Sequence, residues 1–242
     1  MIFVPTLPQS GTWFVLKLLE KCGFKLEFTG DIVNNKKIIE DKEKVALSTH
    51  IFPFYYQASP FKEVFPHYGE HPTTDYVVRK LHMGMAGIEL LTRLHKTIIP
   101  MRDPLACLLT REARAPQLRH FYIIDGFLEV IKRYENHPNV FFFPVDRDNN
   151  FIDRMKAVTE CMQHLDIDFN NNVEAVTKYA AEWKKENTAE NRYREPYENK
   201  DIGKIKDMLD EKVAEVEYLK IHGGTIKPFL QRLGYDTGSL IW

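Results

Sequence analysis

The strongest chemical signal in the sequence is a short glycine-containing turn at residues 8–12 (PQSGT), between an apolar run at residues 2–7 and a helical apolar pattern. Such a turn aims several backbone N–H groups at one point near the positive end of the helix dipole, which favours phosphate binding. Ser10 and Thr12 add hydroxyl donors. An ordinary strand–turn–helix unit in which Ser10 only caps the helix fits the local pattern equally well. No lysine directly follows Gly11, so the turn is not a Walker A loop.

Polar residues also stand at the ends of two later strand candidates. Residues 45–49 (VALST) are followed by His50, and residues 97–101 (TIIPM) are followed by Arg102. A histidine titrates near neutral pH and suits general-base catalysis, while the fork of an arginine matches a phosphate. The simpler alternatives are a histidine bonded to a backbone carbonyl and an arginine paired with a neighbouring carboxylate.

Asp103 and Pro104 predict the start of a helix, because aspartate is a common N-cap and proline is favoured at the first helical position. This helix runs to about residue 114 and carries Thr110.

Residues 139–145 predict another strand, and residues 187–201 predict a loop. Other helical patterns cover residues 12–23, 85–95, 121–134, 151–164, 171–185, 202–219 and 225–233, with Gly23 and Gly234 as helix stops. Strands alternating with helices predict a three-layer α/β fold with a central parallel sheet.

Three segments together resemble the sulfotransferases that use 3′-phosphoadenosine 5′-phosphosulfate (PAPS). The segment TLPQSGTW, residues 6–13, is similar to the family's 5′-phosphosulfate loop, whose usual pattern is Y-P-K-S-G-T-T-W. The segment S-T-H-I at residues 48–51 resembles the family's K-T-H-L segment, whose histidine is the catalytic base. M-R-D-P at residues 101–104, with Thr110, resembles the 3′-phosphate segment. The three occur in the family's order within residues 2–145, and the chain beyond is only weakly matched.

The resemblance implies a P-loop-like nucleotide-binding fold, with PAPS as co-substrate, 3′-phosphoadenosine 5′-phosphate (PAP) as product and no metal. It implies that the amides of residues 9–13, with two hydroxyls of that turn, hold the 5′-phosphate. Arg102 and Thr110 would grip the 3′-phosphate. His50 would take the proton from an acceptor hydroxyl as general base.

The resemblance also implies an aromatic side chain stacked on adenine, either Phe14 or, if the loop is one residue shorter, Trp13. The family's C-terminal R-K-G-x-x-G segment is missing, and Arg192 and Arg194 are candidates to replace it at the 3′-phosphate. A solvated charged loop explains these two arginines equally well. The implied nucleotide-binding residues are Pro8, Gln9, Ser10, Gly11, Thr12, Trp13, Phe14, Arg102, Thr110, Arg192 and Arg194.

The sequence departs from the family at two positions where the family has lysine. Gln9 replaces the loop lysine that stabilises the leaving oxygen, and Ser48 replaces the lysine of the K-T-H segment. Glutamine donates a hydrogen bond without a charge, and loss of one preorganised donor of this kind costs about 10²–10³ in rate. We predict Gln9 as a catalytic group beside His50, with Arg79 and Lys80 as candidate replacement cations. The alternative is a nucleotide- or anion-binding protein of the same fold with weak or no transfer activity.

Aromatic residues just after the K-T-H-like segment predict the walls of a pocket for a small-molecule or carbohydrate acceptor. Phe52, Phe54 and Tyr55 are assigned to it, although core packing explains them nearly as well. No metal site is predicted. His67 and His71 have the spacing of a helical metal pair, but a glycine and prolines around them disrupt such a helix.

The overall composition narrows the function classes. With 33 Lys+Arg against 34 Asp+Glu the net charge is −1, which argues against a protein that coats nucleic acid. The three cysteines form no C-x-x-C pair, and no apolar run reaches the roughly 18 residues of a membrane span. A P-loop kinase ranks last, since no hydrophobic strand ends in a Walker B aspartate. We expect one cytoplasmic domain over residues 1–242.

Overall fold

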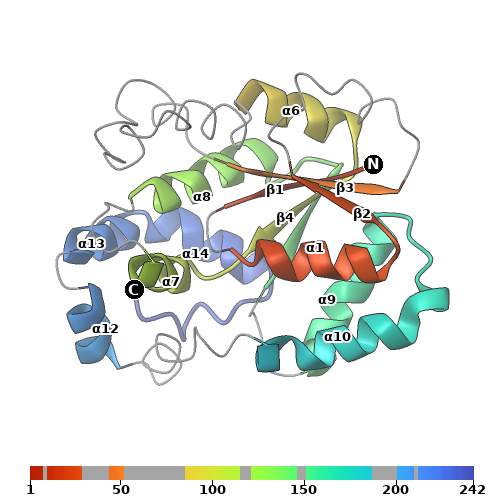
Figure 1. Cartoon of the computed structure of the whole chain (residues 1–242). Coiled ribbons are helices and arrows are strands. Elements are labelled where there is room, and N and C mark those ends of the chain that lie inside the picture. The colour runs from red at the N-terminus through yellow and green to blue at the C-terminus, as the bar shows by residue number, and fades with distance from the viewer. Residues whose placement is uncertain are drawn as a thin grey trace, which may run out of the picture.

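The computed structural model describes residues 1–7, 10–28, 44–51, 85–114, 121–145, 151–186, 201–209 and 212–242. Its centre is a five-stranded parallel sheet with helices on both faces (Figure 1). The strands lie in the order β2-β3-β1-β4-β5 and span β1 (Ile2–Thr6), β2 (Lys25–Phe28), β3 (Val45–His50), β4 (Thr97–Met101) and β5 (Val140–Pro144). The predicted three-layer α/β fold with a central parallel sheet is confirmed.

The inner strands are apolar because helices cover both of their faces. Every residue of β1 and of β4 is buried, as expected for parallel strands between two helical layers. β1 pairs with β3 so that Thr6 lies opposite His50, and Phe3 of β1 lies opposite Thr97 of β4. β2 has no counterpart among the predicted strands, and its residues KLEF alternate polar and apolar at the edge of the sheet.

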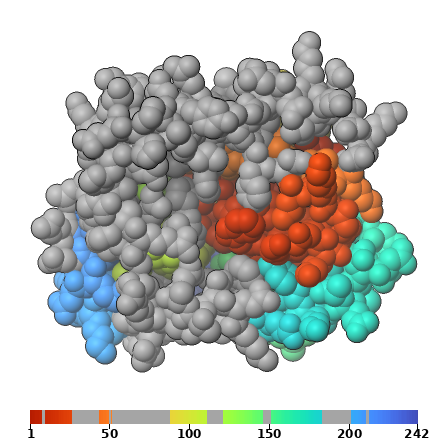
Figure 2. Space-filling view, in the orientation of Figure 1, coloured from red at the N-terminus to blue at the C-terminus, as the bar shows by residue number. Residues whose placement is uncertain are grey.

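One face of the sheet is covered by three helices, α1 (Thr12–Lys21), α9 (Phe151–His164) and α10 (Val173–Glu186). A short 3-10 helix, η2 (Asn170–Asn172), leads into α10. Figure 2 shows α1 in red beside α10 in cyan on the same side of the molecule. Their buried side chains form one apolar cluster with Val4 of β1 and Phe143 of β5.

The opposite face carries the remaining helices and a second apolar cluster. Phe3, Leu47 and Ile99 of the sheet belong to it, together with residues of six helices. These helices are α6 (Met85–Leu94), α7 (Pro104–Arg114), α8 (Phe121–Tyr134), α12 (Ile202–Leu209), α13 (Val213–Ile221) and α14 (Gly223–Arg232). Among the residues that the structure describes, the core therefore consists of two clusters, one on each side of the sheet.

The prediction of a single helix over residues 202–219 is wrong. The region contains α12 and α13, with Lys212 at the N-cap of α13. Four of the six apolar positions that suggested one helix are buried, and Ile202 and Val213, the first residue of each helix, are exposed. The apolar spacing continues from one helix to the next, so periodicity alone does not reveal the break between them.

The predicted helix stops at Gly23 and Gly234 are confirmed. Both glycines have positive φ angles, 84° and 86°. After α14, the N–H of Gly234 donates to the Gln231 carbonyl at 2.9 Å and the N–H of Tyr235 donates to the Leu230 carbonyl at 3.0 Å. This is a Schellman motif, which turns the chain sharply at a left-handed residue. The turn starts the segment of residues 235–242, whose first and last residues contact the chain just after β4 and β5.

The three cysteines of the chain are all buried and form no disulfide. Burial raises the pKa of the Cys22 thiol to about 11, so the thiol is protonated at neutral pH. Among the helices of the described segments, none has the length and apolar character required to cross a membrane.

Candidate functional site

The carboxyl ends of β1 and β4 mark the place where the chain connections change sides. β1 leads into α1 on one face of the sheet, and the neighbouring β4 leads into α7 on the other (Figure 1). In parallel α/β proteins, ligands bind in the crevice outside strand ends of this kind. The glycine turn follows β1 and Arg102 follows β4, so both predicted phosphate-binding elements lie at this edge.

Ser10 closes the turn between β1 and α1. Its backbone N–H donates to the Leu7 carbonyl at 3.2 Å and its hydroxyl donates to the same oxygen at 2.8 Å. Because Ser10 is fully buried, its hydroxyl stabilises the turn and does not face solvent. The turn presents instead the backbone at the start of α1 and the partly exposed Thr12. No acidic side chain stands in the first turn of α1.

Gly11 sets the position of the start of α1. It is the N-cap residue and has a φ of 97°, in the left-handed region that favours glycine. A Cβ atom at Gly11 would lie 2.6 Å from Cγ1 and 2.8 Å from Cγ2 of Val145. The Val145 N–H donates to the Met101 carbonyl at 2.8 Å. The glycine turn is therefore held against the ends of β4 and β5 as well as against β1.

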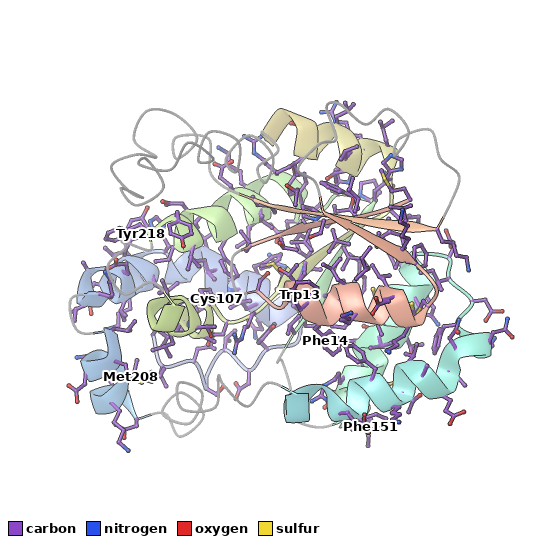
Figure 3. All side chains as sticks on the ribbon, in the orientation of Figure 1. Trp13, Phe14, Cys107, Phe151, Met208 and Tyr218 are labelled. Carbon is purple, nitrogen blue, oxygen red and sulfur yellow. The ribbon has the colours of Figure 1, made fainter. Side chains whose placement is uncertain are left out.

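The two aromatic residues proposed for adenine have different environments (Figure 3). Trp13 is 55 % exposed at the start of α1, whereas Phe14 is 2 % exposed. The ring of Phe14 lies 5.4 Å from that of Phe143 and 5.6 Å from that of Tyr179 on α10, centroid to centroid. Phe14 is thus a core residue. The prediction that it stacks on adenine is wrong, because its ring is buried and has no exposed face. Trp13 is the exposed one of the two aromatic side chains.

Arg102 and Thr110 are brought together by the start of α7. The Arg102 Nη1 donates to the Thr110 Oγ1 at 3.1 Å, although eight residues separate them in sequence. Thr110 is buried and its hydroxyl donates to the Ala106 carbonyl at 2.8 Å, while Arg102 is partly exposed. The pair combines a permanent positive charge with a hydroxyl next to the first turn of α7, which carries no acidic side chain.

Asp103 caps α7, as predicted from the sequence. Its Oδ1 accepts the Leu105 N–H at 2.9 Å, and Pro104 is the first helical residue. The same oxygen accepts the indole N–H of Trp242 at 2.7 Å. Asp103 is 3 % exposed, and these donors stabilise its buried carboxylate. The residue next to Arg102 is therefore held by both its own helix and the C-terminal segment.

The strand that carries the predicted base lies next to the glycine turn. His50 is the last residue of β3 and pairs with Thr6 of β1 in the sheet register, two residues after Ser48. The side chain of Ser48 is 4 % exposed, and its hydroxyl donates to the Val4 carbonyl at 3.1 Å. A lysine at position 48 would place its charge inside the sheet, which is costly and gives a physical reason for serine here.

The other predicted site residues lie outside the described part of the chain. Of His50 the backbone is described and the side chain is not. The remaining residues outside it are Pro8, Gln9, Phe52, Phe54, Tyr55, Arg192 and Arg194, with the candidate cations Arg79 and Lys80. Their roles stay as predictions from the sequence.

Two residues for which the sequence predicts no role contact the chain at the carboxyl ends of β4 and β5. The Tyr235 hydroxyl lies 2.9 Å from the Met101 carbonyl oxygen and 2.7 Å from that of Val145, and Trp242 reaches Asp103. No local pattern around them carries a signal, because both act through contacts with strands far away in sequence. Within the described ranges no cluster of three or more His, Cys, Asp or Glu is arranged to hold a metal ion.

Comparison of the sequence with protein-family models gave no match, and comparison with curated proteins gave no significant match. The geometry of the strand ends and the motifs in the sequence therefore carry the functional argument.

Proposed function

We propose that this chain binds PAPS and transfers its sulfuryl group to a hydroxyl or amine of an acceptor. The observation that carries the proposal is the hydrogen bond of 3.1 Å between Arg102 and Thr110 at the end of β4, beside the glycine turn of β1. PAPS has two separate phosphate-bearing ends, and the edge of the sheet offers two separate anion-binding elements. The motifs that resemble the PAPS-dependent family supply the rest of the assignment.

The two elements suit the two ends of the nucleotide. The start of α1 directs backbone N–H groups and a helix dipole at the 5′ end, where the leaving group carries charge. Arg102 suits the 3′-phosphate because its fork forms two parallel charge-assisted hydrogen bonds. Thr110 would turn its hydroxyl proton from the Ala106 carbonyl to the phosphate, a rotation about one bond. Trp13 is exposed at the start of α1 and suits stacking on the base.

The transfer itself needs in-line geometry and a base for the acceptor. His50, at the end of the strand next to β1, would accept the proton of the acceptor hydroxyl as its oxygen attacks sulfur. The bond between sulfur and the 5′-phosphate oxygen breaks, and PAP leaves. Gln9 would donate a hydrogen bond to the leaving oxygen. Sulfur keeps its oxidation state because one bond to sulfur replaces another, and the phosphate is a good enough leaving group to depart without a metal.

A second candidate function is binding of the nucleotide without transfer. Its specific support is Ser48, which is buried and bonded to the Val4 carbonyl, where the resembling family has a lysine. Together with Gln9 in the turn, this leaves both positions without a charge for the departing oxygen. Such a protein would keep the affinity for PAP and lack turnover.

Incubation with labelled PAPS and a library of hydroxyl and amine acceptors, beside a thermal-shift titration with PAP, distinguishes these functions. The enzyme is expected to label at least one acceptor. In either case PAP at about 100 times its Kd adds roughly 2.7 kcal/mol of stability. Stabilisation without labelling supports the binding protein. Absence of stabilisation contradicts both functions.

Gln9→Lys is expected to raise the rate of transfer at least about tenfold, because it restores a charged donor to the leaving oxygen. The measurement is kcat with labelled PAPS, with PAP affinity measured in parallel. The control for altered net charge combines Gln9→Lys with Lys17→Gln, which removes an exposed lysine paired with Glu20 on the same helix and so restores the wild-type net charge. An unchanged rate in Gln9→Lys would show that another cation already serves the leaving group.

A further inference from the structure

The segment of residues 235–242 contacts the chain on both sides of Arg102. Tyr235 lies 7 % exposed after the turn that ends α14, and its hydroxyl is shared between the carbonyls of Met101 and Val145, at 2.9 Å and 2.7 Å. Met101 is the last residue of β4 and precedes Arg102 directly. The backbone on the amino side of Arg102 is therefore tied to the ends of two strands by one buried hydroxyl.

Trp242 holds the residue on the other side. Its indole N–H donates to the Asp103 Oδ1 at 2.7 Å, and its side chain is 5 % exposed. The Lys227 ammonium lies 4.9 Å from the centroid of the indole ring, a cation–π contact with α14 that fixes the ring from the outside. Because the same carboxylate oxygen caps α7, the indole also helps to set where α7 begins relative to β4.

The two contacts act on the position of the guanidinium rather than on its chemistry. Arg102 reaches Thr110 only because the chain turns at Asp103 into α7. A buried carboxylate that loses a donor shifts towards other donors or towards water, since the unmet hydrogen bond is costly. A shift at Asp103 would move the backbone next to Arg102 and change its distance to Thr110.

We propose that Trp242 is a positioning residue for Arg102, and that with Tyr235 it aligns the guanidinium for the 3′-phosphate of the bound nucleotide. This inference rests on the proposed function. It predicts that the C-terminal segment contributes to the preference for a 3′-phosphorylated nucleotide without touching that nucleotide.

The test is Trp242→Phe, which keeps an aromatic ring for packing and removes the N–H donor. The ratio of the affinities for PAP and adenosine 5′-phosphate, measured by calorimetry, is expected to fall about fivefold. This is the size of effect expected when one ordinary hydrogen bond is lost, here the bond that aligns Arg102 through Asp103. The affinity for adenosine 5′-phosphate stays unchanged. A role in stability alone would lower both affinities together or neither, and would leave the ratio as it is.

Tyr218→Phe is the matched control, because Tyr218 on α13 also donates from an aromatic side chain to an aspartate Oδ1, that of Asp125, at 2.9 Å. This variant is expected to keep the wild-type ratio. If Trp242→Phe does not fold, Tyr235→Phe tests the same alignment from the other contact.

Three results would overturn the inference. The first is a wild-type ratio in a folded Trp242→Phe or, where that variant does not fold, in Tyr235→Phe. The second is an equal fall of the ratio in Tyr218→Phe. The third is a wild-type protein that binds PAP no more tightly than adenosine 5′-phosphate. This result also contradicts the proposed function, whereas the first two contradict only the role of the C-terminal segment.

Discussion

Replacing Arg102 with alanine is expected to weaken PAP binding about 100-fold and to leave the affinity for adenosine 5′-phosphate unchanged. The guanidinium offers charge-assisted hydrogen bonds, and their loss at a partly buried site costs about 3 kcal/mol, where 1.4 kcal/mol corresponds to a factor of ten. Thr110→Val should weaken PAP about tenfold, because it removes only the hydroxyl at 3.1 Å from Arg102 Nη1. Isothermal calorimetry with both nucleotides measures the effect.

Arg93→Ala is the control for this prediction. Arg93 lies at the end of α6, pairs with Glu89 and has a side chain 67 % exposed, so its loss changes the net charge equally without touching the edge of the sheet. Arg102→Lys keeps the charge and loses the fork, and an intermediate affinity is expected. Equal losses for PAP and adenosine 5′-phosphate in Arg102→Ala would refute a role at the 3′-phosphate.

β1, β3 and β4 could be predicted because they are inner strands with buried residues, and β5 could be predicted from its apolar run VFFFP, although Phe143 is the one buried residue of that edge strand. Runs such as the one in β4, where all five residues are buried, have no polar alternation and stand out in the sequence. β2 could not be predicted, since a four-residue edge strand with exposed Lys25 resembles a loop. The break between α12 and α13 was hidden because apolar spacing reports which side chains are buried and not where a helix stops.

The contact of Arg102 with Thr110 could be predicted in part, because both residues belong to one strand–helix unit whose start is fixed by Asp103. The N-cap and the helix period set the distance between two such residues, and both can be read from the local sequence. The contacts of Gly11 with Val145 and of Trp242 with Asp103 depend instead on how distant segments pack, and no spacing in the sequence encodes them. The same reason explains Phe14: the resemblance implied an aromatic side chain stacked on adenine but did not reveal that this ring is buried in the core.

Gly11→Ala is expected to lower the free energy of unfolding by about 3 kcal/mol, as measured by chemical denaturation. The left-handed φ of 97° costs an alanine about 1–2 kcal/mol. The added Cβ would also lie 2.6 Å from Val145 Cγ1, and forcing an atom into a packed site costs a further 1–3 kcal/mol or so. Relief of this clash requires α1 to move away from β5, so PAP affinity should fall in the folded fraction as well.

Gly23 at the other end of α1 provides the matched control. It too has a positive φ, 84°, but an added Cβ would meet nothing within 4 Å. Gly23→Ala therefore carries the backbone cost alone, about 1 kcal/mol, and should leave PAP affinity unchanged. Adding Val145→Ala to Gly11→Ala removes both γ-methyl groups and should make the pair less destabilising than the two single changes summed. Equal losses of stability in Gly11→Ala and Gly23→Ala would show that the turn is not held against Val145, and that the start of α1 is positioned by β1 alone.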